Sequence, residues 1–440
     1  MSNVFTGAPC GRIAVPSRVS PTTRARLRPL SSPRLGALVA LLAAAGAVSP
    51  PVHALGFTEA LELAEQQSPR ITAQRLQIDA AGSTQKAAGT LPDPKLSVGI
   101  ENFPVTGMDR GSLTRESMTM QRIALMQEVP NRAKRDAQIA GAQAKVERER
   151  ATLAVQRVQI REELSQAWIL AQAIEQRDLV ITDLLAENQR LQDSLPSRIA
   201  GGTAQANDLL AARKEALALS DRRDDLRRDR AKARAMLRRW VGSRSDEVLQ
   251  GTPGPLSRPV EELRAQVQRH AELAQYPAMQ AMAAAESLEA QAQARGDWSW
   301  EVAYSRRARR WGDMVSFQVT FDLPWQQERR QGPQIKAKQL ELQRLEAEQE
   351  DVTRRRLQEL DDSAGELAAL QSQIERLQSA GIGLAQGRAH LALANYQAAK
   401  GDLSAVLGAR AQVLEAQWRL IDLQVQRDAV TARLNSLIAD

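Results

Sequence analysis

The stretch DWSWEVAYSRRARRWGDMVSFQVTFDLPW, residues 297–325, differs from the rest of the chain in both composition and periodicity. It holds seven of the fifteen aromatic residues in a sequence of 440. Apolar and polar residues alternate strictly along both of its flanks, which is the two-residue period of a strand with one apolar face. The residues predicted for that face are Trp298, Trp300, Val302, Tyr304, Val315, Phe317, Val319, Phe321 and Leu323. The sequence therefore predicts two strands, at about 298–305 and 314–323.

The length and the aromatic content of these strands point toward a lipid bilayer. A tilted strand needs about 9–11 residues to cross a membrane, and the two predicted strands come close to that length. An apolar outer face with aromatic residues near its ends is typical of outer-membrane barrels. A small soluble sheet packed on helices is the alternative that periodicity alone leaves open.

A fainter strand pair occurs earlier in the chain, at about 95–103 and 117–129. In the first of these strands Leu96, Val98 and Ile100 alternate with polar or small residues and are predicted to lie on the apolar face. In the second strand the alternation changes phase near Gln121 and Arg122, which we interpret as a β-bulge.

Most of the remaining chain has the pattern of long helices. Residues 133–195 contain no proline and one glycine, and such a helix is about 95 Å long. A stripe with a period of 3.5 residues predicts a coiled-coil seam within it. The seam runs through Ile160, Leu164, Ala167, Ala171, Ile174, Ile181, Leu185 and Leu195, and Asp178, Asn188 and Gln192 interrupt it. Shorter helices are predicted at 57–89 and 203–240, and laid end to end they match the long one in length.

The order of these elements occurs twice, which predicts a duplicated unit of about 200 residues. The second half is expected to contain helices at 257–295, 333–395 and 402–439. The predicted organisation is a first repeat at 55–243, a linker at 244–256 and a second repeat at 257–440. The antiparallel packing of the long and short helices predicts a rod or tube wall rather than a compact domain.

Residues 1–54 have the features of an export signal. They contain six arginines and no acidic residue, and the apolar run 35–48 is too short to span a bilayer as a helix. Val52 and Ala54 fit a signal-peptidase site, although a buried N-terminal helix is an alternative. Cys10, the only cysteine, would leave with this segment. The formal charge of +7 falls to about +1 without it, which argues against a nucleic-acid-binding protein.

The sequence carries no signature of catalysis or of a cofactor. Beyond residue 54 its histidines are His270 and His390, and it contains none of the metal, nucleotide or nucleophile motifs of common enzymes. Met118, Met120 and Met126 are interpreted as strand packing rather than as a soft-metal site. We therefore predict no catalytic residues, no cofactor, no metal ligands and no enzymatic activity.

Four strands are too few to close a barrel, and open strand edges in lipid leave backbone groups unpaired. The membrane interpretation therefore requires several copies of the chain, of which three would give twelve strands and room for a pore. The outer loops would be 104–116 and 306–313. The second contains Arg306, Arg307, Arg309 and Arg310, which either contact lipopolysaccharide phosphates or form a solvated turn.

Over nearly all of the chain beyond the signal, the sequence resembles the TolC-type outer-membrane efflux factors. The resemblance rests on the repeated helix-strand-strand-helix-helix plan and on four segments. These are TEALELAEQQSPRI at 58–71, LPDPKLSVGIENFP at 91–104, QEVPNRAKR at 127–135 and GTAQANDLLAAR at 202–213. The second segment most resembles the branch that serves heavy-metal resistance-nodulation-division (RND) pumps of the cobalt-zinc-cadmium or copper-silver type.

The resemblance implies a mainly α protein with a small β part that forms a homotrimer. A 12-stranded barrel in the outer membrane of a Gram-negative bacterium would continue as a helical coiled-coil tunnel in the periplasm. The implied function is a passive exit duct for heavy-metal cations, and the implied partners are a membrane-fusion adaptor, an inner-membrane RND pump and outer-membrane lipid. Two alternatives remain: a drug-efflux or type I secretion channel of the same family, and a periplasmic coiled-coil scaffold outside the membrane.

The resemblance also assigns the helix-turn tips to adaptor docking. The residues concerned are Arg198, Ile199, Ala200, Gly201, Gly202, Tyr396, Lys400 and Gly401. Asp208 and Asp402 lie where an entrance constriction would be expected. Alternatively, both aspartates stabilise the positive end of a helix dipole.

Overall fold

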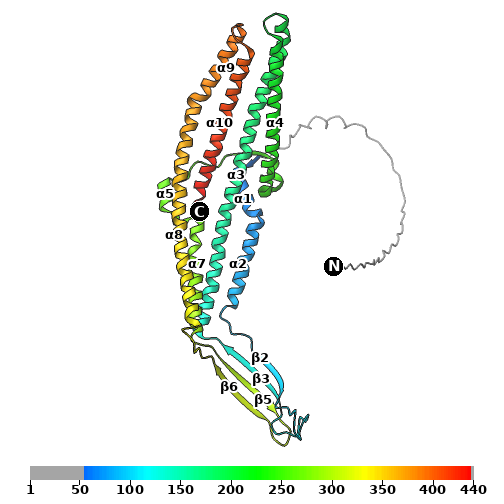
Figure 1. Ribbon diagram of the computed structural model, residues 1–440, viewed down its shortest axis with the longest axis vertical. Helices are drawn as coiled ribbons and strands as arrows, with labels where there is room; N and C mark the ends of the chain where they lie inside the picture. Colours follow the sequence, from blue (N-terminus) through cyan, green and yellow to red (C-terminus); the bar gives the residue numbers. More distant parts are fainter. Residues whose placement is uncertain (1–53, 438–440) are drawn as a thin grey trace, which may run out of the picture. The chain divides into compact units, whose positions relative to one another are not determined.

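The computed structural model describes residues 54–437, so Cys10 and the predicted signal peptide up to residue 53 lie outside the described part. Long helices run side by side, and a four-stranded sheet extends from one end of them (Figure 1). No helix within residues 54–437 has both the length and the apolar character needed to cross a membrane.

The first half of the described chain contains four helices. They are α1 (Phe57–Gln67), α2 (Pro69–Ala87), α3 (Arg132–Ala200) and α4 (Ala206–Val241). The prediction of one helix over 57–89 is wrong, because Ser68 has an extended backbone (φ −67°, ψ 120°) between α1 and α2. Steric conflict with the ring of Pro69 disfavours helical geometry at the preceding residue.

The second half contains α5 (Val260–Ala265), α6 (Ala271–Ala274), α7 (Tyr276–Gln293), α8 (Gln331–Arg376), α9 (Ile382–Gln397) and α10 (Leu403–Ser436). A single π-helical turn, Leu377–Gly381, joins α8 to α9, so the two form one long rod. The prediction of one continuous helix over 257–295 is wrong. The chain turns at Val267–Arg269, and His270 then caps α6 by accepting a hydrogen bond from the Glu272 backbone N–H at 3.1 Å.

The predicted seam of α3 lies in the core of the helical bundle. Ile160, Leu164 and Ile181 are fully buried there, and Leu185 packs against them while remaining partly exposed. Asn188, which interrupts the apolar pattern, is also buried, and its amide donates to Glu215 at 2.6 Å and accepts from Gln192 at 2.6 Å. A polar residue in the seam is therefore satisfied by partners on α4 and on its own helix.

One small sheet has no counterpart in the sequence prediction. The short strands β1 (Ala54–Gly56) and β4 (Val248–Gln250) pair in parallel. The residues predicted as a linker, 244–256, thus include a strand as well as the end of a 3-10 helix, Gly242–Asp246. Trp168 of α3 anchors the chain just beyond β4, because its indole N–H donates to the Gly251 carbonyl at 2.9 Å.

The larger sheet consists of β2 (Lys95–Glu101), β3 (Met120–Val129), β5 (Trp298–Arg306) and β6 (Met314–Phe321). Its strand order is β2-β3-β5-β6, and every neighbouring pair is antiparallel. The predicted β-bulge near Gln121 is wrong, since the register runs without interruption from Lys95↔Met126 to Glu101↔Met120. The strand keeps its geometry, and the phase change reflects polar residues on the apolar face. One of these, Gln127, donates its amide to the Pro92 carbonyl at 2.7 Å.

Candidate functional surfaces

One face of the four-stranded sheet is apolar from edge to edge. Residues that pair directly across strands project from the same face, so the register assigns each side chain to a face. Two complete apolar rows cross all four strands. They are Leu96, Leu125, Val302 and Phe317, and Val98, Ile123, Tyr304 and Val315. Of the twelve residues predicted for the apolar face, eleven lie on this one face of the sheet, together with Ile123 and Leu125. The twelfth, Leu323, lies beyond the end of β6 at Phe321.

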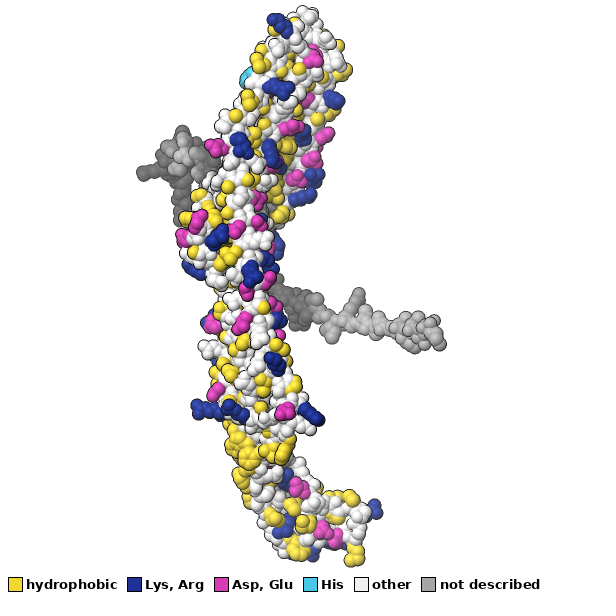
Figure 2. Space-filling model, turned by 60° about the vertical axis from the view of Figure 1, so that its left-hand side comes forward, with side chains coloured by type: hydrophobic (Ala, Val, Ile, Leu, Met, Phe, Trp, Pro, Cys, Tyr) yellow, Lys and Arg dark blue, Asp and Glu magenta, His cyan; other side chains and the backbone are white. Residues whose placement is uncertain are grey.

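The apolar face is exposed in the single chain. The exposed fraction is 73% for Val98, 68% for Phe317 and 40% for Val302. Hydrophobic side chains concentrate at the surface where the helices give way to the sheet (Figure 2). A contiguous apolar surface of this kind marks an interaction with a membrane or with another protein.

The opposite face carries polar and small residues, and it is sheltered along the two central strands, β3 and β5, but exposed on β2 and β6. Ser299 and Ser305 are buried, and the cross-strand pair Ala124 and Ala303 is only 1% exposed. This arrangement inverts that of a soluble sheet, in which the apolar face packs inward and the polar face meets water. The inversion is expected of a barrel wall whose interior is wet and whose exterior meets lipid.

Charged residues on the polar face pair with one another across the strands. Arg122 of β3 lies 3.2 Å from a carboxylate oxygen of Glu101 on β2 and also pairs with Glu301 on β5. Lys95 pairs with Glu128. Ala124 and Ala303 lie between Arg122 and Glu301 in the register, and their small side chains leave room for the two long ones to meet. Polar groups on the sheltered face are thus held by partners in the same chain.

Both edges of the sheet lack a strand partner within the described residues. β2 forms one edge and β6 the other, and every residue of both strands is exposed. In lipid each unpaired edge N–H or C=O group costs several kcal/mol, so such a sheet requires strands from another copy.

A second candidate surface lies at the far end of the bundle, where two helix-turn-helix tips pack together. In the first tip α3 ends at Ala200, and Gly202 reverses the chain with φ +69°. In the second α9 ends at Gln397, and Ala399 takes the same left-handed conformation with φ +55°. A small apolar cluster joins the tips, formed by Leu195, Ala212, Tyr396, Leu403 and Val406.

Tyr396 links the two tips through polar contacts as well. Its hydroxyl donates to Asp208 Oδ2 at 3.0 Å, and the Arg198 guanidinium lies 4.5 Å from the centre of its ring. Burial raises the pKa of the Tyr396 hydroxyl, and the hydrogen bond to Asp208 raises it further. Two of the residues predicted at the tips, Arg198 and Tyr396, therefore join Asp208, predicted for the constriction, in one network that connects α3, α4 and α9.

The two aspartates predicted for an entrance constriction both cap helices. Asp208 accepts the backbone N–H of Gln205 at 3.0 Å within a capping box. Asp402 accepts from Ser404 Oγ at 2.8 Å and from the Ala405 N–H at 3.1 Å, and these bonds hold its pKa below the usual value. No hydrogen bond or ion pair joins Asp208 to Asp402 in the described structure. The capping geometry supports the helix-dipole alternative for both residues.

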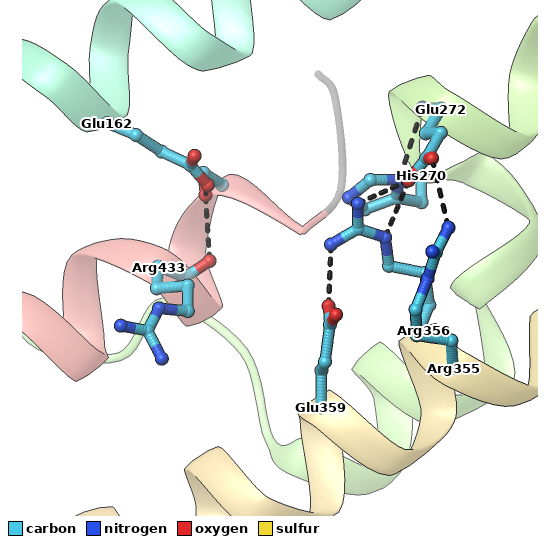
Figure 3. A network of polar contacts seen from close by, with 8 residues as sticks. Glu162, His270, Glu272, Arg355, Arg356, Glu359 and Arg433 are labelled. Carbon is cyan, nitrogen blue, oxygen red and sulfur yellow. Dashed lines mark hydrogen bonds and ion pairs between the residues drawn. The ribbon is translucent and has the colours of Figure 1, made fainter. Parts of the chain in front are cut away.

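A partly buried ionic network near the middle of the bundle has no signature in the sequence (Figure 3). Glu272 of α6 pairs with Arg356 of α8, with 2.8 Å between Glu272 Oε2 and Arg356 Nε, and Arg356 also reaches Glu359 at 2.6 Å. Burial, and secondarily the charge of Arg356, lowers the pKa of His270 to about 4. Among residues 54–437 no group of three or more His, Cys, Asp or Glu side chains is arranged to hold a metal ion.

Comparison with sequence families gives no match to a family model and no match among curated proteins. Comparison with solved structures is informative. The outer membrane protein VceC from Vibrio cholerae superposes with a TM-score of 0.72 at 18% identity, covering 87% of this chain and 95% of that one.

Two further channel structures have the same fold. CusC, from a study of folding and transmembrane channel formation, gives a TM-score of 0.70 at 15% identity, over 87% of this chain and 92% of that one. The open state of the MtrE outer membrane channel of Neisseria gonorrhoeae gives a TM-score of 0.67 at 11% identity, over 87% of this chain and 88% of that one. The described chain therefore has the fold of the TolC-like outer-membrane channels, mostly helical with few strands.

Proposed function

We propose that this chain is the outer-membrane channel of a tripartite export system and acts as a passive exit duct. The observation that carries the proposal is the inverted sheet. Its apolar face is exposed, its polar face is ion-paired and is sheltered along the central strands, and both of its edges are open. A bilayer around a closed ring of such sheets satisfies all three features at once.

We infer that three copies close the ring. Each copy contributes four strands, so two copies give a small barrel filled by its own side chains, whereas three give twelve strands and a pore. The closing contact would pair β6 of one copy with β2 of the next, because these are the two open edges. The helices would then continue from the barrel as a periplasmic tunnel.

The tips at the far end of the helices are the proposed docking site for a periplasmic membrane-fusion adaptor and an inner-membrane RND pump. Arg198, Ile199, Ala200, Gly201 and Gly202 end the first tip. Tyr396, Lys400 and Gly401 belong to the second. In this arrangement Asp208 and Asp402 would lie near the periplasmic entrance, and their carboxylates are the candidates for narrowing it.

The proposed substrates are heavy-metal cations, and the support for them is the LPDPKLSVGIENFP segment. Drug efflux or type I secretion by a channel of the same family is the second candidate. A passive duct does not bind its cargo tightly, so we assign selection of the substrate to the pump and the adaptor.

The first experiment tests membrane insertion. The exported protein should be extracted from the outer-membrane fraction only with detergent, migrate as a heat-modifiable trimer and conduct ions in a planar bilayer. A monomer or dimer that stays in water without detergent would support the periplasmic scaffold instead.

The second experiment tests the substrate. Cells lacking the chain should become sensitive to cobalt, zinc, cadmium, copper or silver salts, while their sensitivity to lipophilic drugs should not change. Sensitivity to drugs alone would favour the second candidate. The identity of the adjacent pump and adaptor genes offers an independent check.

A further inference from the structure

We propose that the arginine-rich loops at the far end of the sheet bind the phosphate groups of lipopolysaccharide lipid A. This inference rests on the proposed function, because an outer-membrane channel would place these loops at the outer leaflet. The loops are residues 102–119, between β2 and β3, and residues 307–313, between β5 and β6. We define the loop patch by the arginines Arg110, Arg115, Arg306, Arg307, Arg309 and Arg310.

The loop patch carries a surplus of positive charge. Its six arginines stand against Asp109, Glu116 and Asp313, the acidic residues of the two loops. No ion pair joins any of the six guanidinium groups to a carboxylate within the described residues. Two of the carboxylates already accept hydrogen bonds, Asp313 from Tyr304 and Glu116 from the Met118 N–H. The charges of Arg306 and Arg307 do help to lower the pKa of Asp313. Six guanidinium groups against three carboxylates still leave a net positive charge for an anion from outside the chain.

The loops hold one another in place. Arg310 donates to the Arg115 carbonyl and so ties the two loops together. Arg307 donates to the carbonyls of Trp311 at 2.6 Å and Gly312 at 2.8 Å, which braces its own loop. The side chains of Arg306 and Arg309 are exposed and form none of these internal bonds. The structure therefore combines braced loops with exposed arginines that are ready to bind.

Apolar groups accompany these arginines and indicate a lipid rather than free phosphate. Val105 is 72% exposed and Met108 97% exposed in the first loop, and Trp311 lies under the Arg310 guanidinium in the second, 5.1 Å from ring centre to Cζ. The apolar sheet face begins directly beside the loops, at Tyr304 and Val315. A lipid could place its phosphates against the arginines of the loops and its acyl chains along the apolar face of the sheet.

Lipid A fits better than a phospholipid because of its charge. Arginine binds phosphate in a bidentate manner, so a patch of several guanidinium groups is best matched by a headgroup with more than one phosphate. Lipid A carries two phosphates, and a glycerophospholipid such as phosphatidylglycerol carries one. We therefore assign the loop patch to lipid A.

The test measures lipid binding to the detergent-purified trimer by native mass spectrometry. The probes are bisphosphoryl lipid A, monophosphoryl lipid A and phosphatidylglycerol. The variant Arg306→Gln/Arg309→Gln removes two guanidinium groups that have no internal bonds. The matched control Arg75→Gln/Arg190→Gln removes two arginines from α2 and α3 that are also exposed.

We expect the loop variant to bind bisphosphoryl lipid A about tenfold more weakly, because it loses charge-assisted hydrogen bonds to phosphate. The control should bind as the wild type does, and the wild type should prefer bisphosphoryl lipid A over both other probes. Unchanged binding by the loop variant would overturn the proposal, as would equal wild-type affinity for phosphatidylglycerol. Failure of the channel function itself would appear separately, as the absence of conductance in the wild-type trimer.

Discussion

The helical bundle buries its apolar residues, whereas the four-stranded sheet exposes the apolar residues of one face. In the bundle Trp168 and Ile160 are completely buried, whereas in the sheet Val98 is 73% and Phe317 68% exposed. The residues are of the same kind, so the difference lies in what surrounds each region. Neighbouring helices cover the stripe of α3, whereas nothing within residues 54–437 covers the apolar face of the sheet. An exposed apolar surface in one region can thus be as well specified by the sequence as a buried core in another.

The largest expected effect comes from a charge on the exposed sheet face. Phe317→Arg places a guanidinium in the central apolar row, which costs about 2–4 kcal/mol per chain in mid-bilayer and roughly 6–12 for three copies. The variant should not form heat-modifiable trimers in the outer-membrane fraction. Gln318→Arg, on the neighbouring polar face, is the matched control and should assemble. Normal assembly of Phe317→Arg would contradict the assignment of the two faces.

In the bundle, truncation of a buried apolar side chain should lower the free energy of unfolding, as it does in an ordinary protein core. Trp168→Ala removes a fully buried ring that lies edge-to-face with Phe57, 5.6 Å between ring centres, and should cost about 3–5 kcal/mol. Urea unfolding followed by circular dichroism measures this loss in the free energy of unfolding. Leu76→Ala, at a position 64% exposed, should cost less than about 0.5 kcal/mol. If Trp168→Ala and Leu76→Ala lost the same free energy of unfolding, the buried stripe of α3 would not act as a core.

A smaller effect concerns the buried histidine of the bundle. His270 has a folded-state pKa of about 4, below its ordinary value, and it faces Arg356, Glu272 and Glu359. The unfolded chain therefore takes up a proton near pH 6.5, before the folded chain does, and stability falls as the pH drops from about 6.5 toward 4. The loss at pH 5 should be roughly 2 kcal/mol.

The comparison of melting temperatures at pH 7 and pH 5 tests this expectation. His270→Asn keeps an N-cap acceptor but does not titrate, so its melting temperature should change less over this range than that of the wild type. If both proteins lose the same stability, the acid sensitivity arises from other groups.

The smallest expected effect is at the tips. Tyr396→Phe removes the hydrogen bond to Asp208 and should cost about 0.5–1.5 kcal/mol. Hydrogen exchange should become faster at the end of α9 and the start of α4. Tyr276→Phe is the matched control, because Tyr276 is buried and its hydroxyl forms no hydrogen bond in the described structure. Identical exchange in the two variants would indicate that the Tyr396 hydroxyl does not tie the tips together.

Local periodicity predicted the parts of the fold that repeat a simple pattern. Alternation along β5 and β6 assigned Val302, Tyr304 and Phe317 to one face, and the register confirms that they share it. The 3.5-residue stripe found the buried side of α3. The same reasoning failed in β3, where polar Gln121 and Gln127 lie on the apolar face without any bulge.

The features that the sequence did not reveal depend on contacts between distant residues. β1 and β4 have three residues each, too few to show a period, and the paired residues Leu55 and Leu249 lie 194 positions apart in the sequence. Tyr396 meets Asp208 across 188 residues, and Arg356 meets Glu272 across 84. No local pattern predicts such pairs, because each partner alone is an ordinary surface or core residue.

The most direct test of the central claim is the accessibility of single cysteines in the outer membrane. Cys10 lies in the segment expected to be removed, so a cysteine introduced at 315, 316, 317, 318 or 319 would be the only thiol. The account predicts that Val315→Cys, Phe317→Cys and Val319→Cys are quenched by lipid-phase probes and protected from water-soluble maleimide, while Ser316→Cys and Gln318→Cys behave in the opposite way. Reaction of all five with the water-soluble reagent, with no alternation, would contradict it.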